Sequence, residues 1–374
     1  MRMATTSTID ASDFAADAPE FRAASDEFVR REVVGHLEDW RAGRGSSSEF
    51  FTLAGEFGLL GMTVPAEMGG AGLQDRRYAD LVVESLATVG ALGTALAVGF
   101  HSGVALPALL ARPSRAFDNL IAAAAVGADV IAIANLEGSI HIESTPGGQQ
   151  VLVGTSAAVV NAAVADHFML LLDDGIDGSV ILLVAADRVV VQPPTKLLGM
   201  PESGCRNVTF KSIELSEEMV IGRGVDRSTW FADIAMVIST ACIEAARVAV
   251  RQTVEYVCER QVFGRPLAEF ENTRGVLGGL HAEATVVAAC HREYASVRQA
   301  GEAGDSNVAA LVVRSAALLD RAVDQCLQLH GGYGYMREYP IAHAFAAARQ
   351  ILLIVDRLSP VQQALEAAVG LHDS

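Results

Sequence analysis

Two short segments decide the fold of this chain: Gln328-Leu329-His330-Gly331-Gly332-Tyr333-Gly334-Tyr335 and, upstream of it, Arg260-Gln261-Val262-Phe263-Gly264. Paired glycines carry no side chain and let another molecule approach the backbone closely. An arginine keeps its charge at every relevant pH and suits phosphate oxygens. Each motif alone also has a structural explanation, because an arginine can cap helix carbonyls and Gly-Gly can end a helix. In this order and spacing, the two together favour a functional role.

Helical periodicity extends outward from both segments. Apolar residues at three- and four-residue spacing predict three long helices over residues 231–260, 271–300 and 307–330. The same spacing predicts one or two more helices over residues 341–371. Long helices with short connections predict a four-helix bundle.

The N-terminal part is also helical in pattern, but the middle changes period. Periodic stretches at 21–40 and 50–60 lie within a helical region that runs from residue 13 to about 115. Short β-prone runs then follow at 130–133, 150–153, 168–172, 179–184 and 188–192. Turn residues such as Pro146-Gly147-Gly148 and Asp173-Asp174-Gly175 separate them. They predict a small antiparallel barrel or sandwich. The fold class is therefore α+β, with a helical domain at 1–125, a β domain at 126–225 and a helical bundle at 226–374.

Composition narrows the class of protein. A chain of 374 residues with 51% apolar and 20% charged residues predicts a globular protein with more than one core. The net charge of −17 argues against a nucleic-acid partner, because phosphate contacts need clustered lysine and arginine. Gly99-Phe100-His101-Ser102-Gly103 lacks the G-x-S-x-G spacing of a serine nucleophile, so His101 and Ser102 are expected to be a satisfied packing pair.

The cysteines and the apolar stretches indicate a cytoplasmic protein without metal. The five cysteines are widely spaced and the nine histidines show no metal-ligand spacing, which predicts buried free thiols in a reducing compartment and no metal site. The apolar stretch 120–136 is interrupted by Asp129 and is shorter than the ~20 residues that span a bilayer. Early Asp10, Asp13 and Asp17 argue against a signal peptide. No membrane association is expected.

Over nearly its whole length the chain resembles acyl-CoA dehydrogenases. The resemblance is carried, in order, by 56–73 in the first helical domain, by 196–200, 208–210 and 220–222 in the closing strands of the middle domain, and by 260–267 and 328–340 in the bundle. It implies that fold, a dimer often paired into a tetramer, and an FAD lying across each dimer interface. One subunit's β domain and bundle would hold the isoalloxazine ring, and the neighbour's bundle the pyrophosphate and adenosine.

The half-site offered to a neighbour is mostly intact. By resemblance, Arg260 contacts the FAD pyrophosphate, Phe263 belongs to the same motif, and Gln328, Gly331 and Gly332 form the Q-x-x-G-G element beside the cofactor. Glu271 departs from the family, which more often has glutamine near the adenine.

The half-site for the flavin ring is eroded. The family's T-E-P-x-x-G-S-D loop survives only as Asn135-Leu136-Glu137-Gly138-Ser139-Ile140. Where the family has G-x-K-x-W-I-T, this chain reads Gly154-Thr155-Ser156-Ala157-Ala158-Val159-Val160. Ala158 and Val160 therefore supply neither the aromatic wall nor the hydroxyl of the family.

No residue matches the catalytic base, a glutamate that removes the α-proton of the acyl thioester. At its commoner position Val355 falls at the glutamate, or Asp356 if one residue is inserted, and Asp356 is interpreted as a solvated charge. At the second position the chain has Ile234 beside Asp233. An offset of one residue on a helix turns a side chain by ~100°, which points Asp233 elsewhere.

Three functions remain after this reasoning. The leading hypothesis is a non-catalytic subunit of a heteromeric α2β2 acyl-CoA dehydrogenase, which shares FAD with a paralogous catalytic subunit. That partner would bind most of the acyl-CoA substrate, and family analogy favours a bulky, steroid side-chain acyl-CoA. The alternatives are a self-sufficient homotetramer with Asp356 or Asp233 as a displaced base, and a flavin-free scaffold of the same fold.

Overall fold

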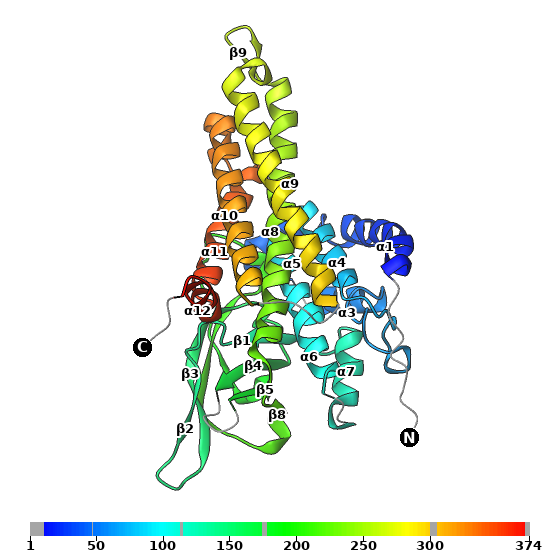
Figure 1. Cartoon of the computed structure of the whole chain (residues 1–374), viewed down its shortest axis with the longest axis vertical. Coiled ribbons are helices and arrows are strands. Elements are labelled where there is room, and N and C mark those ends of the chain that lie inside the picture. Colours follow the sequence, from blue (N-terminus) through cyan, green and yellow to red (C-terminus); the bar gives the residue numbers. More distant parts are fainter. Residues whose placement is uncertain (1–10, 47, 113–114, 174–177, 300–304, 371–374) are drawn as a thin grey trace.

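The computed structural model describes residues 11–46, 48–112, 115–173, 178–299 and 305–370. Helices form both ends of the chain and two small sheets form the middle (Figure 1). The element type changes from helix to strand between residues 125 and 131, and back to helix between residues 223 and 227. Most of the turn predicted at 173–175, and the acidic residues Asp10 and Asp13, lie outside the part whose side chains are described.

The first part of the chain is a helical domain built around one apolar helical segment. Its α-helices are α1 (Ala11–Glu32), α2 (Leu37–Asp39), α3 (Ser48–Glu56), α4 (Arg77–Thr88), α5 (Leu92–Val98), α6 (Leu106–Leu110) and α7 (Asp118–Ala125). A π-helical turn at Gly99–Ala105 joins α5 to α6. Within the described chain, the stretch Leu92–Leu110 is the one helical segment long and apolar enough to cross a membrane, and it is 89% buried inside the protein. It therefore forms the core of this domain.

The middle of the chain forms two four-stranded sheets, in the orders β1-β4-β5-β8 and β2-β3-β7-β6. The strands are β1 (Ile131–Ala134), β2 (His141–Ser144), β3 (Gln150–Val159), β4 (His167–Asp173), β5 (Ser179–Ala185), β6 (Val190–Val191), β7 (Arg206–Glu214) and β8 (Val220–Arg223). Phe168 and Phe210 meet edge to face between the sheets, with centroids 6.4 Å apart. The two inner faces thus share one core.

The prediction of an antiparallel domain is wrong for one pair of strands. β1 and β4 run parallel, with Ile131 opposite His167. The chain between them builds β2 and β3 of the other sheet, so it crosses over before it returns, and it therefore enters β4 in the direction of β1. Every other pair of β1 to β8 is antiparallel.

The C-terminal part is the expected bundle. It consists of α8 (Arg227–Glu259), α9 (Glu271–Gln299), α10 (Asp305–His330) and α11 (Pro340–Asp356), followed by the short α12 (Ser359–Ala368). Between α8 and α9 a hairpin of β9 (Gln261–Val262) and β10 (Arg265–Pro266) projects at the far end of the bundle (Figure 1). Asp226 caps α8, because its carboxylate accepts the Ser228 N–H at 2.9 Å.

Helix α8 joins the bundle to the first domain and is buried on most sides. It packs against α10 on one side and against α4 and the π-helical turn on the other. A Cβ at Gly99 would lie 2.4 Å from the Cγ1 of Val237. Glycine is needed there because the two helices approach so closely.

Candidate functional site

The predicted phosphate-binding residues lie around one surface cavity at the projecting end of the bundle. Arg260, Gln328, Gly331 and Gly332 all line it, and its volume is about 380 Å³. We call it the Arg260 cavity. Arg260 follows the last residue of α8. Gln328 lies at the end of α10 and the two glycines begin the 3-10 turn that follows it, so the bundle brings the two motifs together.

An aromatic cluster holds this cavity in shape. Tyr256 stacks on His330 with ring centroids 4.2 Å apart, and the Tyr256 hydroxyl donates to the His330 carbonyl at 3.2 Å. The His330 Nδ1–H donates to the Cys326 carbonyl at 2.8 Å, which fixes the imidazole at the end of α10. The Arg260 guanidinium lies 5.5 Å from the centroid of Tyr333. No described carboxylate lies within 4.0 Å of Arg260, so its charge is available to an outside anion.

The two glycines of this cavity differ in what requires them. Gly331 has φ +58°, a left-handed backbone conformation that favours glycine. A Cβ at Gly332 would meet no described atom of this chain within 4 Å. The fold alone therefore does not require glycine at 332, as expected where another molecule approaches the backbone.

Phe263 stands apart from the other predicted residues. It lies at the tip of the β9–β10 hairpin with φ +52° and is 94% exposed, and it does not line the Arg260 cavity. Tyr335, at the end of the Gly-Gly segment, is 92% exposed. Both rings therefore point away from this chain.

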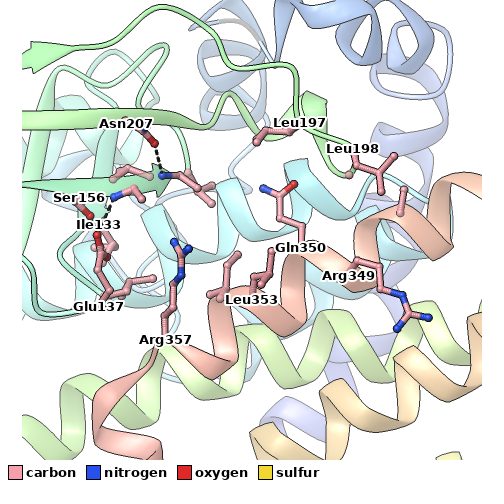
Figure 2. Close-up of a pocket in the computed structure, with 18 residues that line it drawn as sticks. Ile133, Glu137, Ser156, Leu197, Leu198, Asn207, Arg349, Gln350, Leu353 and Arg357 are labelled. Atoms are coloured by element: carbon pink, nitrogen blue, oxygen red, sulfur yellow. Dashed lines mark hydrogen bonds between the residues drawn. The ribbon is translucent and has the colours of Figure 1, made fainter.

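A second cavity lies where the flavin ring would be expected from the resemblance. It opens between the end of β3, residues 197–199 and α11, with a volume of about 340 Å³, and Ala158 and Val160 both line it. We call it the β3–α11 cavity (Figure 2). Glycine at 199 permits a close approach to α11, because a Cβ there would lie 2.2 Å from the Ala346 carbonyl oxygen.

The polar groups on the β3 side of this cavity are already engaged within the chain. The Ala157 N–H donates to Glu137 Oε1 at 2.7 Å, and the Ala158 N–H donates to Asn207 Oδ1 at 3.0 Å. Ser156 Oγ–H donates to Glu137 Oε2 at 3.1 Å. Figure 2 shows these contacts at the end of β3. A flavin ring needs hydrogen-bond partners at its polar edge, and these backbone donors are not free to serve it.

FAD thus fits one half of its expected environment and not the other. The Arg260 cavity supplies an unpaired guanidinium and exposed glycine backbone, which suit a pyrophosphate. The β3–α11 cavity offers alanine and valine walls, and its backbone donors are occupied.

Neither acidic candidate for the base lines any of the three described cavities. Asp356 is exposed at the end of α11 and lines none of the described cavities, whereas Val355 beside it is 4% exposed. Ile234 lines a third cavity of about 210 Å³, together with Trp230 and Leu358. Hydrocarbon therefore occupies the second position of the family base.

Asp233 is engaged in a buried ion-pair cluster instead. Its carboxylate accepts two hydrogen bonds from Arg76, at 3.0 and 2.9 Å, and one from Arg298 Nε at 2.8 Å. The aspartate is 4% exposed. It joins α4 of the first domain to α8 and α9 of the bundle.

His101 and Ser102, which were expected to be a satisfied packing pair, differ in their hydrogen bonding. His101 is satisfied, because its Nδ1 accepts the Ile131 N–H at 3.1 Å and its Nε2–H donates to the Ala124 carbonyl at 2.9 Å. Burial lowers the pKa of His101. Ser102, by contrast, has a buried hydroxyl without a described partner.

The cysteines are all free thiols, but they are not all buried. Cys205, Cys242 and Cys326 are buried, whereas Cys258 and Cys290 are exposed because they lie on outer faces of α8 and α9. Among the described residues, no three histidine, cysteine or acidic side chains are placed to hold a metal ion.

The sequence did not reveal several residues that shape these cavities. Asn207 and Gln350 come from segments far from the motifs, and only the tertiary fold places them beside β3 and residues 197–199. Glu137 belongs to the shortened loop, yet nothing in its sequence indicates that its carboxylate turns back onto β3. Arg357 adjoins the candidate base position and faces the β3–α11 cavity (Figure 2).

Comparison with known proteins agrees with this architecture. The model of the acyl-CoA dehydrogenase N-terminal domain matches residues 16–116, and that of the C-terminal domain matches residues 222–353. A probable acyl-CoA dehydrogenase of Bacillus subtilis is 24% identical over 90% of this chain, which spans 62% of that relative's length. The rat mitochondrial long-chain specific acyl-CoA dehydrogenase is 23% identical over 90% of this chain and 82% of its own.

Solved structures share the fold. The acyl-CoA dehydrogenase of Geobacillus kaustophilus superposes with a TM-score of 0.85 at 21% identity, over 94% of this chain and 98% of its own. A glutaryl-CoA dehydrogenase of Mycobacterium smegmatis, solved in complex with FADH2, superposes with a TM-score of 0.83 at 18% identity, over 96% of this chain and 97% of its own. With both terminal domains matched in order and this fold between them, the chain belongs to the acyl-CoA dehydrogenase family.

Proposed function

We propose that this chain is the non-catalytic subunit of a heteromeric, FAD-dependent acyl-CoA dehydrogenase. In an α2β2 complex it would supply the Arg260 cavity to the pyrophosphate and adenosine of an FAD whose ring a paralogous catalytic subunit holds. That partner would also provide the base and most of the acyl-CoA site.

One observation carries the proposal: the phosphate half-site of this chain is open to a ligand, whereas contacts within the chain occupy the polar groups of the ring half-site. Arg260 has no described carboxylate partner and faces an open cavity with Gly331 and Gly332. At the ring half-site, Glu137 and Asn207 occupy the donors at the end of β3. Retention of one half-site with loss of the other suits a chain that serves a cofactor held by its neighbour.

The geometry of the acidic residues argues against a displaced base in this chain. A base must come within hydrogen-bond reach of the proton it removes. Asp233 is held by Arg76 and Arg298, and Asp356 lines none of the described cavities. A self-sufficient enzyme would therefore need a rearrangement of the bundle.

The substrate class and the compartment are part of the same proposal. A mixed dimer with one acyl site leaves room for a bulky group, so we propose an acyl-CoA with a steroid side chain as the substrate class. We place the complex in the cytoplasm, because all five cysteines are free thiols, as in a reducing compartment.

The test is to purify this chain alone and after co-expression with an adjacent dehydrogenase gene that keeps the ring-binding residues and the base. The proposal expects a colourless protein alone and a yellow mixed tetramer with about one FAD per pair of chains, read from the flavin spectrum and native mass. A yellow homotetramer of this chain would show that it is an enzyme in its own right. A mixed tetramer whose FAD content is the same with Arg260→Gln as with the natural chain would favour the flavin-free scaffold.

A further inference from the structure

The β3–α11 cavity is a formed pocket although its residues do not suit a flavin ring. Its volume of about 340 Å³ falls within the range of small-molecule sites, about 300–1,000 Å³. Much of its wall is hydrocarbon, supplied by Ile133, Leu136, Val160, Leu197, Leu353 and Ile354. Such a wall suits an apolar ligand.

The polar groups along β3 do not attract a ligand, because the chain satisfies them. Glu137 accepts the Ala157 N–H and a Ser156 hydroxyl, and Asn207 accepts the Ala158 N–H. These contacts leave the β3 side of the cavity without free backbone donors at residues 157 and 158. Apart from Glu137, the charged side chains that line the cavity are Arg349 and Arg357, both on or directly after α11.

The two arginines on α11 differ in this respect. Arg349 also lines the cavity, but its guanidinium points away from it (Figure 2), pairs with Asp320 at 2.7 Å and lies 4.5 Å from the centroid of the Phe345 ring. Arg357 projects between Glu137 and Leu353 (Figure 2). In the described chain no carboxylate lies within 4.0 Å of the Arg357 guanidinium. An unpaired cation thus stands at the mouth of an apolar pocket.

We propose that the β3–α11 cavity binds an apolar monocarboxylate. The hydrocarbon would lie against Leu136, Val160 and Ile354, and the carboxylate would accept paired hydrogen bonds from Arg357, which suits the planar guanidinium. This site lies on the present chain and needs neither flavin nor the reaction proposed above.

Binding is measured on the full chain, alone or in the mixed complex, with cis-parinaric acid as the probe, because its fluorescence rises on transfer to an apolar site. The expected result is one saturable site per chain. Arg357→Gln should weaken binding about tenfold or more, as for loss of a charge-assisted hydrogen bond. Arg349→Gln is the matched control on the same helix and should leave the affinity within twofold.

Two further measurements separate binding in this cavity from binding elsewhere on the chain. Leu353→Trp, at a half-exposed position on the rim, should obstruct the cavity and abolish saturable binding while the thermal unfolding midpoint stays unchanged. The alcohol of the same chain length should bind the natural protein about tenfold more weakly than the acid, and Arg357→Gln should remove that preference.

Three results would overturn the proposal. Equal affinity in the natural protein and Arg357→Gln would exclude the carboxylate contact, and unchanged binding in Leu353→Trp would place the probe elsewhere. Competitive displacement of the probe by free riboflavin would show that the cavity still accepts a flavin ring. The mixed complex can contain FAD whichever result is found, so failure here is distinguishable from failure of the proposed function.

Discussion

Arg260 is the residue on which the proposed function depends most directly. Its guanidinium has no described carboxylate partner, and the end of α8 holds it over the Tyr333 ring at 5.5 Å. A permanently charged group without an internal partner is suited to an external phosphate.

We expect Arg260→Gln to weaken FAD binding by the mixed complex about tenfold to a hundredfold, because a charge-assisted hydrogen bond contributes about 1.5–3 kcal/mol. The dissociation constant is measured by reconstituting the flavin-free complex with FAD. Arg265→Gln is the control, since Arg265 lies on the hairpin that follows Arg260, with its guanidinium 4.1 Å from the Phe270 ring centroid. Unchanged FAD affinity in the Arg260 variant would contradict the assignment.

Asp356 tests whether this chain carries a base of its own. The residue is exposed and lines none of the described cavities, so Asp356→Asn should leave the turnover of the mixed complex within twofold. Removing a true general base lowers the rate by about a hundredfold to ten-thousandfold. A steady-state assay with an acyl-CoA decides between these outcomes, and a loss of that size would restore the self-sufficient enzyme.

The residues of the proposed phosphate half-site were predictable from the sequence, whereas their surroundings were not. Arg260, Gln328, Gly331 and Gly332 stand in local motifs, and the structure brings them to one cavity. The ion-pair partners of Asp233 could not be predicted, because Arg76 and Arg298 are far from it in the chain.

Among the elements, strand β3 changes the site most. The Glu137 carboxylate accepts the Ala157 N–H and the Ser156 hydroxyl, and a Ser139 hydroxyl donates to it at 3.0 Å. The loop between β1 and β2 is thereby attached to β3. The contacts of Glu137 thus occupy this edge of β3 in place of an outside ligand, and they contribute to the stability of the fold.

Glu137→Ala should therefore lower the free energy of unfolding by about 1–3 kcal/mol, because it leaves the Ala157 N–H and nearby hydroxyls without their acceptor. Urea denaturation measures the change, and faster hydrogen exchange at the Ala157 amide should accompany it. Glu143→Ala serves as the comparison, since Glu143 is exposed on β2 and its carboxylate contacts His141. Equal effects of the two substitutions would refute the role of Glu137.

The long helices were predictable and parts of the sheets were not. The predicted helices at 231–260, 271–300 and 307–330 correspond to α8, α9 and α10, because a long apolar period specifies a helix locally. Strand β2 reads His-Ile-Glu-Ser, which has little β propensity, and its pairing with β3 makes it a strand. The parallel direction of β1 and β4 depends on chain crossover and is not encoded locally.

On the scale of the whole molecule, a buried polar seam joins the first domain to the bundle. The Thr240 hydroxyl on α8 lies 3.5 Å from Asp80 Oδ1 on α4 and 2.8 Å from His291 Nε2 on α9. Burial raises the pKa of Asp80 to about 6 and lowers the pKa of His291 to about 4. Arg76, Arg298 and Glu84 also act on these two groups.

The two shifts act on stability with opposite signs. In the unfolded chain an aspartate titrates near about 3.9 and a histidine near about 6.5. Between about pH 4 and 6, folded Asp80 keeps a proton that the unfolded chain has released, so its contribution falls as pH rises. Over about pH 4 to 6.5, folded His291 lacks a proton that the unfolded chain holds, so its contribution is lost as pH falls. The two contributions nearly cancel.

Asp80→Asn should remove the aspartate contribution and leave the pH dependence of stability that comes from His291. Relative to the natural protein, the variant should lose about 3 kcal/mol of unfolding free energy between pH 6.5 and 4. His291→Gln should show the reverse, with stability that falls as pH rises from 4 to 6. Urea denaturation across this range measures both, and parallel pH profiles of all three proteins would refute the buried titration.

The outward rings of Phe263 and Tyr335 have a consequence for how a cell must produce this protein. They are 94% and 92% exposed at the end of the molecule that carries the Arg260 cavity. Exposed apolar side chains beside an open site favour association with other protein surfaces. In the proposed heteromeric complex, copies made in excess of the partner would be prone to aggregation or degradation, so we expect the genes of the two proposed subunits to be transcribed together and the abundance of the two chains to change together.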